Sequence, residues 1–277
     1  MPGPFTFDPQ SFKGMEYAGW ERAAAVYNDS LGVVTSRVAD ALLDATSVRE
    51  GSRLLEVCCG PGYGAGAAAA RGAAIAIGID FAAAMVDVAH MNFPNARFQQ
   101  GDAEALVFED ATFDSVICGF GLRHLTDPDK AIVEAHRVLV PGGRYAFTDW
   151  CGPDKVEYFG LVLGAVRKHG TLDVPLPPAP PLFRFSEPAA CVAALRDGGF
   201  VEVEVTELSL VYRPPTAEQV LEFTQRAAPR MQMILALQSS TARERIRQDI
   251  VEGATRLEKS GRIEIAMPAV LARAQKP

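Results

Sequence analysis

Short apolar runs alternate with helix-like stretches through the middle of the chain. The runs, which predict buried strands, span residues 54–57, 73–79, 97–99, 113–119 and 145–150. One intervening helix is expected to begin at Asp127-Pro128, because aspartate caps a helix and proline fits its first turn. It is expected to run to Leu139 and to stop at Pro141-Gly142-Gly143. Strands that alternate with helices predict βαβ units, a mostly parallel sheet and an α/β fold.

The flanking segments follow a different pattern. Residues 1–50 have aromatic residues at helix-like steps, and Ser30 is expected to cap a second helix there. Residues 186–198 predict a helix capped by Ser186. Residues 201–212 alternate as a strand does and are expected to pair with residues 263–274, the expected last strand, in an antiparallel hairpin.

The helical pattern of residues 216–259 would then interrupt that hairpin. This predicts four parts, which are an N-terminal helical cap, a core with a loop and helix insertion, a second cap segment and a last core strand. Their expected bounds are 1–49, 50–212 with the insertion at 152–185, 213–261 and 262–277.

Composition and charge narrow the class of protein. Of 277 residues, 48% are hydrophobic and 22% are charged, which is enough apolar material for a globular core. A net charge of −7 disfavours a nucleic-acid partner. The five cysteines form no CxxC pair, so we expect neither a disulfide framework nor a metal site, and a cytoplasmic location. The longest apolar stretch, residues 65–81, is interrupted by Arg71 and glycines and predicts no membrane span.

Candidate chemistry lies in residues 54–64, LLEVCCGPGYG, where a strand meets a glycine turn and the start of a helix. Gly60 and Gly62 allow the backbone to approach a ligand closely. Asp80 ends the next strand, where a carboxylate can accept both hydroxyls of a ribose. This pattern alone also fits NAD-dependent enzymes. Glu56 argues against an NAD-dependent enzyme, because its charge would repel the pyrophosphate of NAD. The same charge suits a ligand with an ammonium group or another cation.

Two further motifs occur in the expected order. Gly101-Asp102 follows the third strand, so that Asp102 can accept a hydrogen bond from an adenine amino group. Residues 120–143 read FGLRHLTDPDKAIVEAHRVLVPGG. Together these motifs resemble the class I S-adenosylmethionine-dependent methyltransferases, nearest the branch of the ubiquinone and menaquinone methyltransferases. The resemblance covers about residues 50–150 and, loosely, the last hairpin.

The resemblance implies a Rossmann-like class I methyltransferase fold, in which a seven-stranded, mostly parallel sheet has an antiparallel last strand; the helical cap adds to it. It also implies S-adenosyl-L-methionine as the cofactor. The residues that would contact its methionine end, ribose and adenine are Glu56, Cys58, Gly60, Gly62, Asp80, Phe81, Met85, Asp102, Ala103 and Gly119. The family usually has glycine where Cys58 stands, so this thiol would either crowd the pocket or point into the core. Asp80 and Asp102 have structural alternatives, as a helix cap and as a turn residue.

The expected reaction is methyl transfer to a small apolar or aromatic acceptor, by O- or C-methylation. His124 follows the fourth strand and can take a proton from the acceptor, although Leu122 and Leu125 beside it also fit simple packing. The residues expected to bind the acceptor are Tyr17, Trp20, Tyr27, Asp149 and Met231. The alternatives are a cofactor-binding protein with a non-methylating role and a nucleotide-dependent oxidoreductase. The helical segments are expected to form a mobile cap, or else a permanently closed layer or a homodimer interface.

Overall fold

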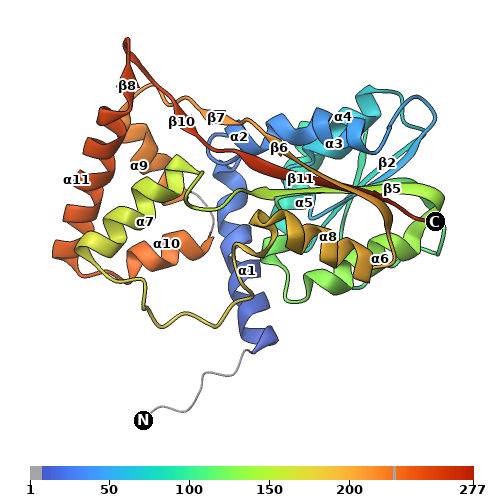
Figure 1. Cartoon of the computed structure of the whole chain (residues 1–277), viewed down its shortest axis with the longest axis horizontal. Coiled ribbons are helices and arrows are strands. Elements are labelled where there is room, and N and C mark those ends of the chain that lie inside the picture. Colours follow the sequence, from blue (N-terminus) through green and yellow to red (C-terminus); the bar gives the residue numbers. More distant parts are fainter. Residues whose placement is uncertain (1–7, 227–228) are drawn as a thin grey trace.

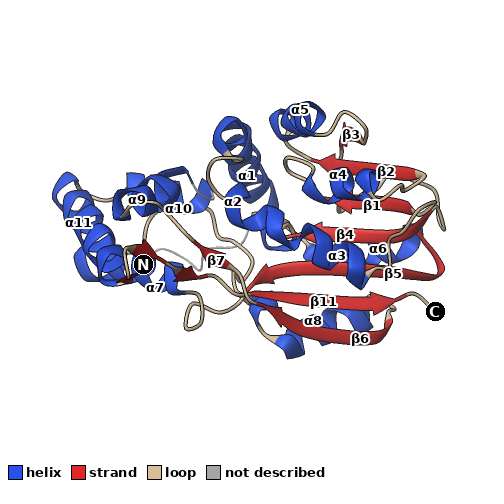
Figure 2. Ribbon diagram, turned by 90° about the horizontal axis from the view of Figure 1, so that it is seen from above, coloured by secondary structure: helices blue, strands red, loops and turns tan. Residues whose placement is uncertain are grey.

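A computed structural model describes residues 8–226 and 229–277. Its centre is a seven-stranded sheet in the order β3-β2-β1-β4-β5-β11-β6 (Figures 1 and 2). The last strand, β11, is antiparallel to its neighbours β5 and β6, whereas β3, β2, β1, β4 and β5 pair in parallel. The expected class I methyltransferase fold is therefore confirmed. The strands are β1 (Arg53–Val57), β2 (Ile75–Asp80), β3 (Arg97–Gln100), β4 (Phe113–Gly119), β5 (Leu139–Trp150), β6 (Val201–Leu208) and β11 (Ala269–Gln275).

Helices cover both faces of this sheet (Figure 2). Those that follow the strands are α4 (Tyr63–Ala70), α5 (Ala83–Asn92), α6 (Pro128–Val138) and α8 (Pro188–Asp197). Helix α6 begins as predicted, with the Asp127 side chain accepting the Lys130 N–H at 3.0 Å. The expected end of this helix before Pro141 is confirmed, since α6 ends at Val138. The expected start of the next strand at Tyr145 was wrong. Strand β5 begins at Leu139, and Gly142, at φ +78°, lies in a bulge where the β4–β5 register shifts.

The N-terminal segment forms a chain of short helices. It contains α1 (Pro9–Ala23), η1 (Ala24–Val26), α2 (Gly32–Thr35), η2 (Ser36–Val38) and α3 (Ala39–Ala45). Two predicted caps were wrong. The Ser30 hydroxyl donates to the Val26 carbonyl instead of capping α2. Ser186 ends η4 (Arg184–Ser186), where its hydroxyl donates to the Phe183 carbonyl.

A second group of helices lies beyond the carboxyl ends of the parallel strands (Figure 1). It contains α7 (Glu157–His169), α9 (Ala217–Arg226), α10 (Pro229–Ala236) and α11 (Ser240–Arg256). Helices α1 and α10 touch closely, since a Cβ on Gly19 would lie 2.1 Å from the Pro229 Cβ. Residues 1–7 of the expected N-terminal cap and residues 227–228 of the second segment lie outside the described residues.

Two short antiparallel ribbons flank the segment that holds α9, α10 and α11. The β7 strand (Val211–Tyr212) pairs with β10 (Ile265–Ala266), and β8 (Glu258–Lys259) pairs with β9 (Arg262–Ile263), both antiparallel. The predicted pairing of the two late strands is confirmed, but each is divided. Pro268, which has no N–H to donate, separates β10 from β11.

No helix among the described residues is long and apolar enough to cross a membrane.

Candidate active site

The glycine turn between β1 and α4 is built around the Glu56 carboxylate. Its two oxygens accept the N–H groups of Gly64 and Ala65 at 3.1 and 2.8 Å, so Glu56 satisfies the first turn of α4. A Cβ on Gly64 would lie 2.6 Å from Glu56 Oε1, which explains the need for glycine there. Burial raises the pKa of Glu56 to about 7, against these two hydrogen bonds. Glu56 borders a small cavity together with Gly60 and Gly119, at the expected place of a methionine end.

Asp80 holds the other side of the same turn. Its Oδ2 accepts the Gly60 N–H at 2.8 Å and its Oδ1 accepts the Ala82 N–H at 3.0 Å. Asp80 also lines the main cavity, and each carboxylate oxygen retains a further lone pair for a ligand. Asp80 therefore stabilises the turn without capping α5, and these contacts are compatible with the expected ribose role. Burial raises the pKa of Asp80 to about 6.

A second small cavity lies on the expected adenine side. Phe81, Asp102, Ala103 and Leu125 border it. Asp102 Oδ1 accepts the Glu104 N–H at 3.0 Å, so this side chain does stabilise a turn. Its Oδ2 forms an ion pair with Lys13 of α1, which the sequence patterns did not indicate. Helix α1 therefore reaches across the sheet edge to this cavity.

Cys58 borders all three cavities, so its side chain faces the site. Its φ of +53° is in the left-handed region that favours glycine. A Cβ on Gly121 would lie 2.9 Å from the Cys58 Sγ and 2.8 Å from the Cys118 Sγ, so the two thiols crowd one point. The Cys118 thiol, together with burial, holds the pKa of Cys58 above its usual range. The Cys151 thiol does not join them; Glu207 lies beside it.

Replacing Cys58 by glycine should retain or improve the binding of S-adenosylhomocysteine. Glycine adopts a positive φ without the strain of about 1–2 kcal/mol that a Cβ brings, and it opens space where the three cavities meet. Isothermal calorimetry on the wild type and the variant measures the effect. A large loss of affinity in a variant with an unchanged circular dichroism spectrum would instead assign the thiol a positive role.

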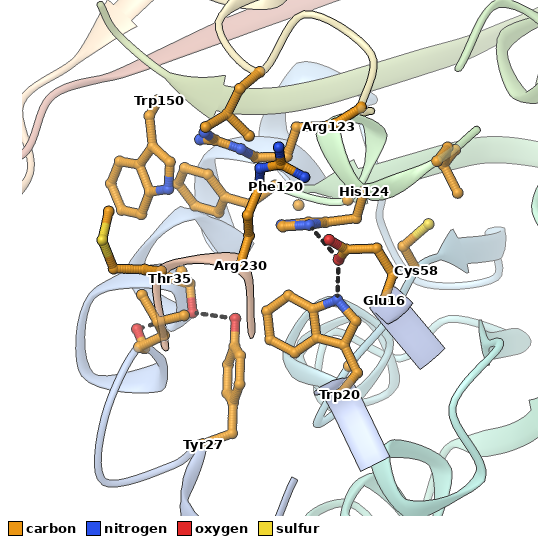
Figure 3. A pocket seen from close by; sticks show the side chains of 18 of the residues that line it. Glu16, Trp20, Tyr27, Thr35, Cys58, Phe120, Arg123, His124, Trp150 and Arg230 are labelled. Atoms are coloured by element: carbon orange, nitrogen blue, oxygen red, sulfur yellow. Dashed lines mark hydrogen bonds and ion pairs between the residues drawn. The ribbon is translucent and has the colours of Figure 1, made fainter. Parts of the chain in front are cut away.

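The main cavity lies between the sheet edge and the helices α1, α2, α7 and α10, and its walls are mostly apolar (Figure 3). The apolar and aromatic side chains that form most of the wall are Phe12, Trp20, Leu31, Phe120, Trp150, Tyr158, Phe159, Leu163, Leu182, Phe183, Met231, Ile234 and Met267. Besides Asp80, four acidic or basic side chains interrupt this apolar wall. Glu16 and Arg230 come from the helices α1 and α10, and Arg123 and His124 come from the segment after β4. Such a cavity suits a flat apolar molecule with few polar groups.

Glu16, Trp20 and His124 form a hydrogen-bonded group in this wall (Figure 3). Glu16 Oε2 accepts the indole N–H of Trp20 at 3.0 Å and lies 2.9 Å from His124 Nδ1. The Trp20 and His124 rings meet edge to face, 4.9 Å apart. With Glu16 as acceptor, Nδ1 carries a proton and the neutral ring keeps Nε2 as a base. Glu16 therefore fixes the orientation of the His124 ring.

Two expected acceptor contacts lie outside the main cavity. Tyr17 is 39% exposed and packs edge-on against Phe81, with ring centroids 5.9 Å apart. Asp149 is buried, where its Oδ1 lies 3.1 Å from Arg123 Nη1 and accepts the Trp150 N–H. Asp149 therefore positions Arg123, which does line the cavity and whose guanidinium lies 5.5 Å from the centre of the Phe183 ring.

The other sequence-predicted residues gather at the sheet edge. Those that line the main cavity are Trp20, Tyr27, Cys58, Gly60, Asp80, Phe81, Met85, Gly119, His124 and Met231. Gly62 borders none of the three cavities; at φ +84° it precedes α4 and packs against Phe98. Glu16, Arg123 and Arg230 were not anticipated. Only Glu16 had a usable signal, because it lies four residues from both Phe12 and Trp20 on one helical face.

The affinity for S-adenosylhomocysteine should fall as the pH is lowered through about 7 and then about 6. Protonation of Glu56 or Asp80 would remove the negative charge that attracts an ammonium group and strengthens hydrogen bonds from hydroxyls, and it would turn one acceptor oxygen into a donor. Calorimetry from about pH 8 to about pH 5 measures the change. An Asp80→Asn variant should lose the lower part of the dependence. A flat profile in the wild type would contradict the assignment of both carboxylates.

Comparison with known proteins agrees with this geometry. Residues 55–147 match the family model described as a methyltransferase domain. The chain is 36% identical over 129 residues to demethylmenaquinone methyltransferase of Renibacterium salmoninarum, covering 46% of this chain and 54% of that protein. It is 35% identical over 143 residues to 2-phytyl-1,4-naphtoquinone methyltransferase of Thermosynechococcus vestitus, covering 48% and 64%. The chain thus spans between half and two thirds of these relatives.

Solved structures share the fold. The YcgJ protein from Bacillus subtilis superposes with a TM-score of 0.56 at 22% identity, over 87% of this chain and 98% of that one. A phosphoethanolamine N-methyltransferase of Haemonchus contortus, in complex with S-adenosylhomocysteine, gives 0.51 at 21% identity, over 87% and 52%. The family match, rather than these likenesses, supports S-adenosylmethionine as the cofactor of the domain.

Proposed function

We propose that this chain, whose residues 55–147 form a class I methyltransferase domain, transfers a methyl group from S-adenosylmethionine to a small apolar or aromatic acceptor. The observation that carries the proposal is the main cavity. It begins at Gly60, Asp80 and Gly119, where the cofactor residues gather, and continues between aromatic walls. The two relatives named above are named for quinone substrates, which are of the same chemical character.

The residues present fit the cofactor. Nothing lies within 4 Å of the point where Gly60 would carry a Cβ, so a ligand can approach its backbone. Glu56 and Asp80 are buried carboxylates with lone pairs left for an ammonium group and for ribose hydroxyls. Asp102 and Ala103 border the adenine side. When bound, S-adenosylmethionine supplies an electrophilic methyl group.

The chain's own residues would then align the acceptor and manage its proton. The aromatic walls hold a flat acceptor and exclude water, and orientation of this kind is worth several kcal/mol, about 7–11 in the best cases. His124, oriented by Glu16, accepts the proton of an acceptor hydroxyl at Nε2. An acceptor that reacts at an activated carbon needs this base less.

Incubation with labelled S-adenosylmethionine and a panel of phenols, naphthols and hydroquinones tests the proposal. Formation of S-adenosylhomocysteine together with a methylated product supports it. Binding of the cofactor without methylation of any acceptor would favour a non-methylating role. Tight binding of NAD without binding of S-adenosylhomocysteine would favour an oxidoreductase.

We also propose that residues 1–30 and 213–261 act as a mobile cap over the acceptor. Trp20 and Met231 come from these two segments and line one cavity, and α1 packs against α10. Binding of S-adenosylhomocysteine should therefore slow hydrogen exchange in both segments, because closure excludes water. Exchange measured by mass spectrometry checks this. Equal, strong protection with and without ligand would show a permanently closed layer instead.

A further inference from the structure

We infer that the acceptor carries an acidic group and that Arg230 binds this group inside the main cavity. The inference rests on the acceptor role proposed above for that cavity. Arg230 belongs to α10, outside residues 55–147 that match the methyltransferase domain. Its side chain reaches into the same space as Arg123 and His124 (Figure 3).

Arg230 has few partners for a guanidinium in an apolar wall. Nη1 donates to the Pro177 carbonyl at 3.1 Å, and the described residues provide no carboxylate in ion-pair contact with it. A guanidinium has five N–H donors, and among the described residues the Pro177 carbonyl is the acceptor seen for it, so donors remain for a ligand. Burial lowers the pKa of Arg230, and the attraction of Glu16 only partly opposes this. Arg230 is half-buried in this apolar wall, and a cation with so little water around it is stabilised by an anion.

The other charges of the cavity are already engaged. Arg123 is paired with Asp149, and its guanidinium also lies over the Phe159 and Phe183 rings at 5.8 and 5.5 Å. Glu16 accepts the Trp20 N–H and lies against His124 Nδ1. Among the described residues that line the cavity, Arg230 is therefore the arginine left without a carboxylate partner and so available to a ligand.

The chemistry of this subsite defines the class of acceptor. A guanidinium matches the paired oxygens of a carboxylate or sulfonate, and it also binds an enolate or phenolate. Aromatic walls take up a flat ring system. The expected acceptor is therefore an aromatic or polycyclic acid, rather than an uncharged quinone.

A matched pair of fluorescent dyes tests the inference without turnover. 8-Anilinonaphthalene-1-sulfonate carries one sulfonate, and N-phenyl-1-naphthylamine is the same ring system without it. Both tryptophans of the chain, Trp20 and Trp150, line the cavity, so energy transfer from tryptophan reports binding there. Each dye is titrated into the protein with and without saturating S-adenosylhomocysteine. Arg230→Gln should weaken binding of the sulfonate dye by about tenfold or more and leave the uncharged dye within about twofold.

Arg243→Gln is the matched control. Arg243 lies in the same group of helices, exposed, and likewise donates one hydrogen bond to a backbone carbonyl, that of Ala236. This variant should bind both dyes as the wild type does. Equal affinity of Arg230→Gln and the wild type for the sulfonate dye would overturn the inference. The inference would also be overturned if the wild type showed no energy transfer to the sulfonate dye. Methyl transfer is assayed separately, so failure of the proposed function leaves the dye result distinct.

Discussion

Replacing Asp80 by alanine should weaken the binding of S-adenosylhomocysteine by more than about tenfold. Each hydrogen bond between a ribose hydroxyl and a carboxylate contributes about 1.5–3 kcal/mol, and the substitution removes the acceptor of two of them. It also removes the acceptor of the Gly60 and Ala82 N–H groups, so the glycine turn loses its anchor. Isothermal calorimetry measures the affinity directly.

Two further variants distinguish the loss of a contact between Asp80 and the cofactor from a general destabilisation of the protein. Asp87→Ala removes an exposed carboxylate from α5 and should leave the affinity unchanged. Asp80→Asn keeps one oxygen acceptor but loses the charge, so its affinity should lie between those of the wild type and the alanine variant. Unchanged affinity in Asp80→Ala would exclude this side chain from the cofactor site.

Replacing His124 by alanine, or Glu16 by glutamine, should lower kcat for a phenolic acceptor by about a hundredfold or more, the usual contribution of general base catalysis. His124→Ala removes the base, whereas Glu16→Gln removes the carboxylate that holds it in one tautomer. The affinity for S-adenosylhomocysteine should change little in either variant. Initial rates with labelled cofactor measure the effect.

The choice of acceptor makes this prediction specific. A nitrophenol that is already ionised at the assay pH has no proton to lose, so both variants should recover most of the wild-type rate with it. Trp20→Phe keeps the contact between Glu16 and His124 and removes only the indole N–H, so its rate should fall much less. Equal losses with ionised and neutral acceptors would show that the two residues position the acceptor and take no proton.

The sheet, and the gathering of the proposed cofactor residues at its edge, could be predicted because the signals for them are local. The apolar run before Gly60, the acid at the end of β2 and the cap at Asp127 each lie within a few residues of the element that they define. The start of β5 could not be predicted in this way. Proline and glycine usually stop a helix and begin a loop, but here β4 offers a partner on the next strand, and Gly142 is accommodated in a bulge.

The main cavity, the proposed acceptor site, was harder to predict, because its walls depend on how helices pack across the sheet edge. Phe12, Glu16 and Trp20 share the inward face of α1, whereas Tyr17 lies on the side that faces Phe81. An aromatic stripe alone does not show which of its members turns inward. Arg230 carries no signal in the sequence, since an arginine on a helix is usually exposed to solvent.

The ribbon of β7 and β10 bears on how such a protein can change over time. Val211 pairs with Ala266, so the chain leaves and returns at one point, with the helices α9, α10 and α11 between. Insertions whose ends are held close together can be replaced or lengthened with little loss of stability. Recombination at this ribbon would exchange Arg230 and Met231 together while the glycine turn, Asp80 and the order of the sheet stay intact. Exchange of this one segment would therefore change the proposed acceptor site and leave the proposed cofactor site unaltered.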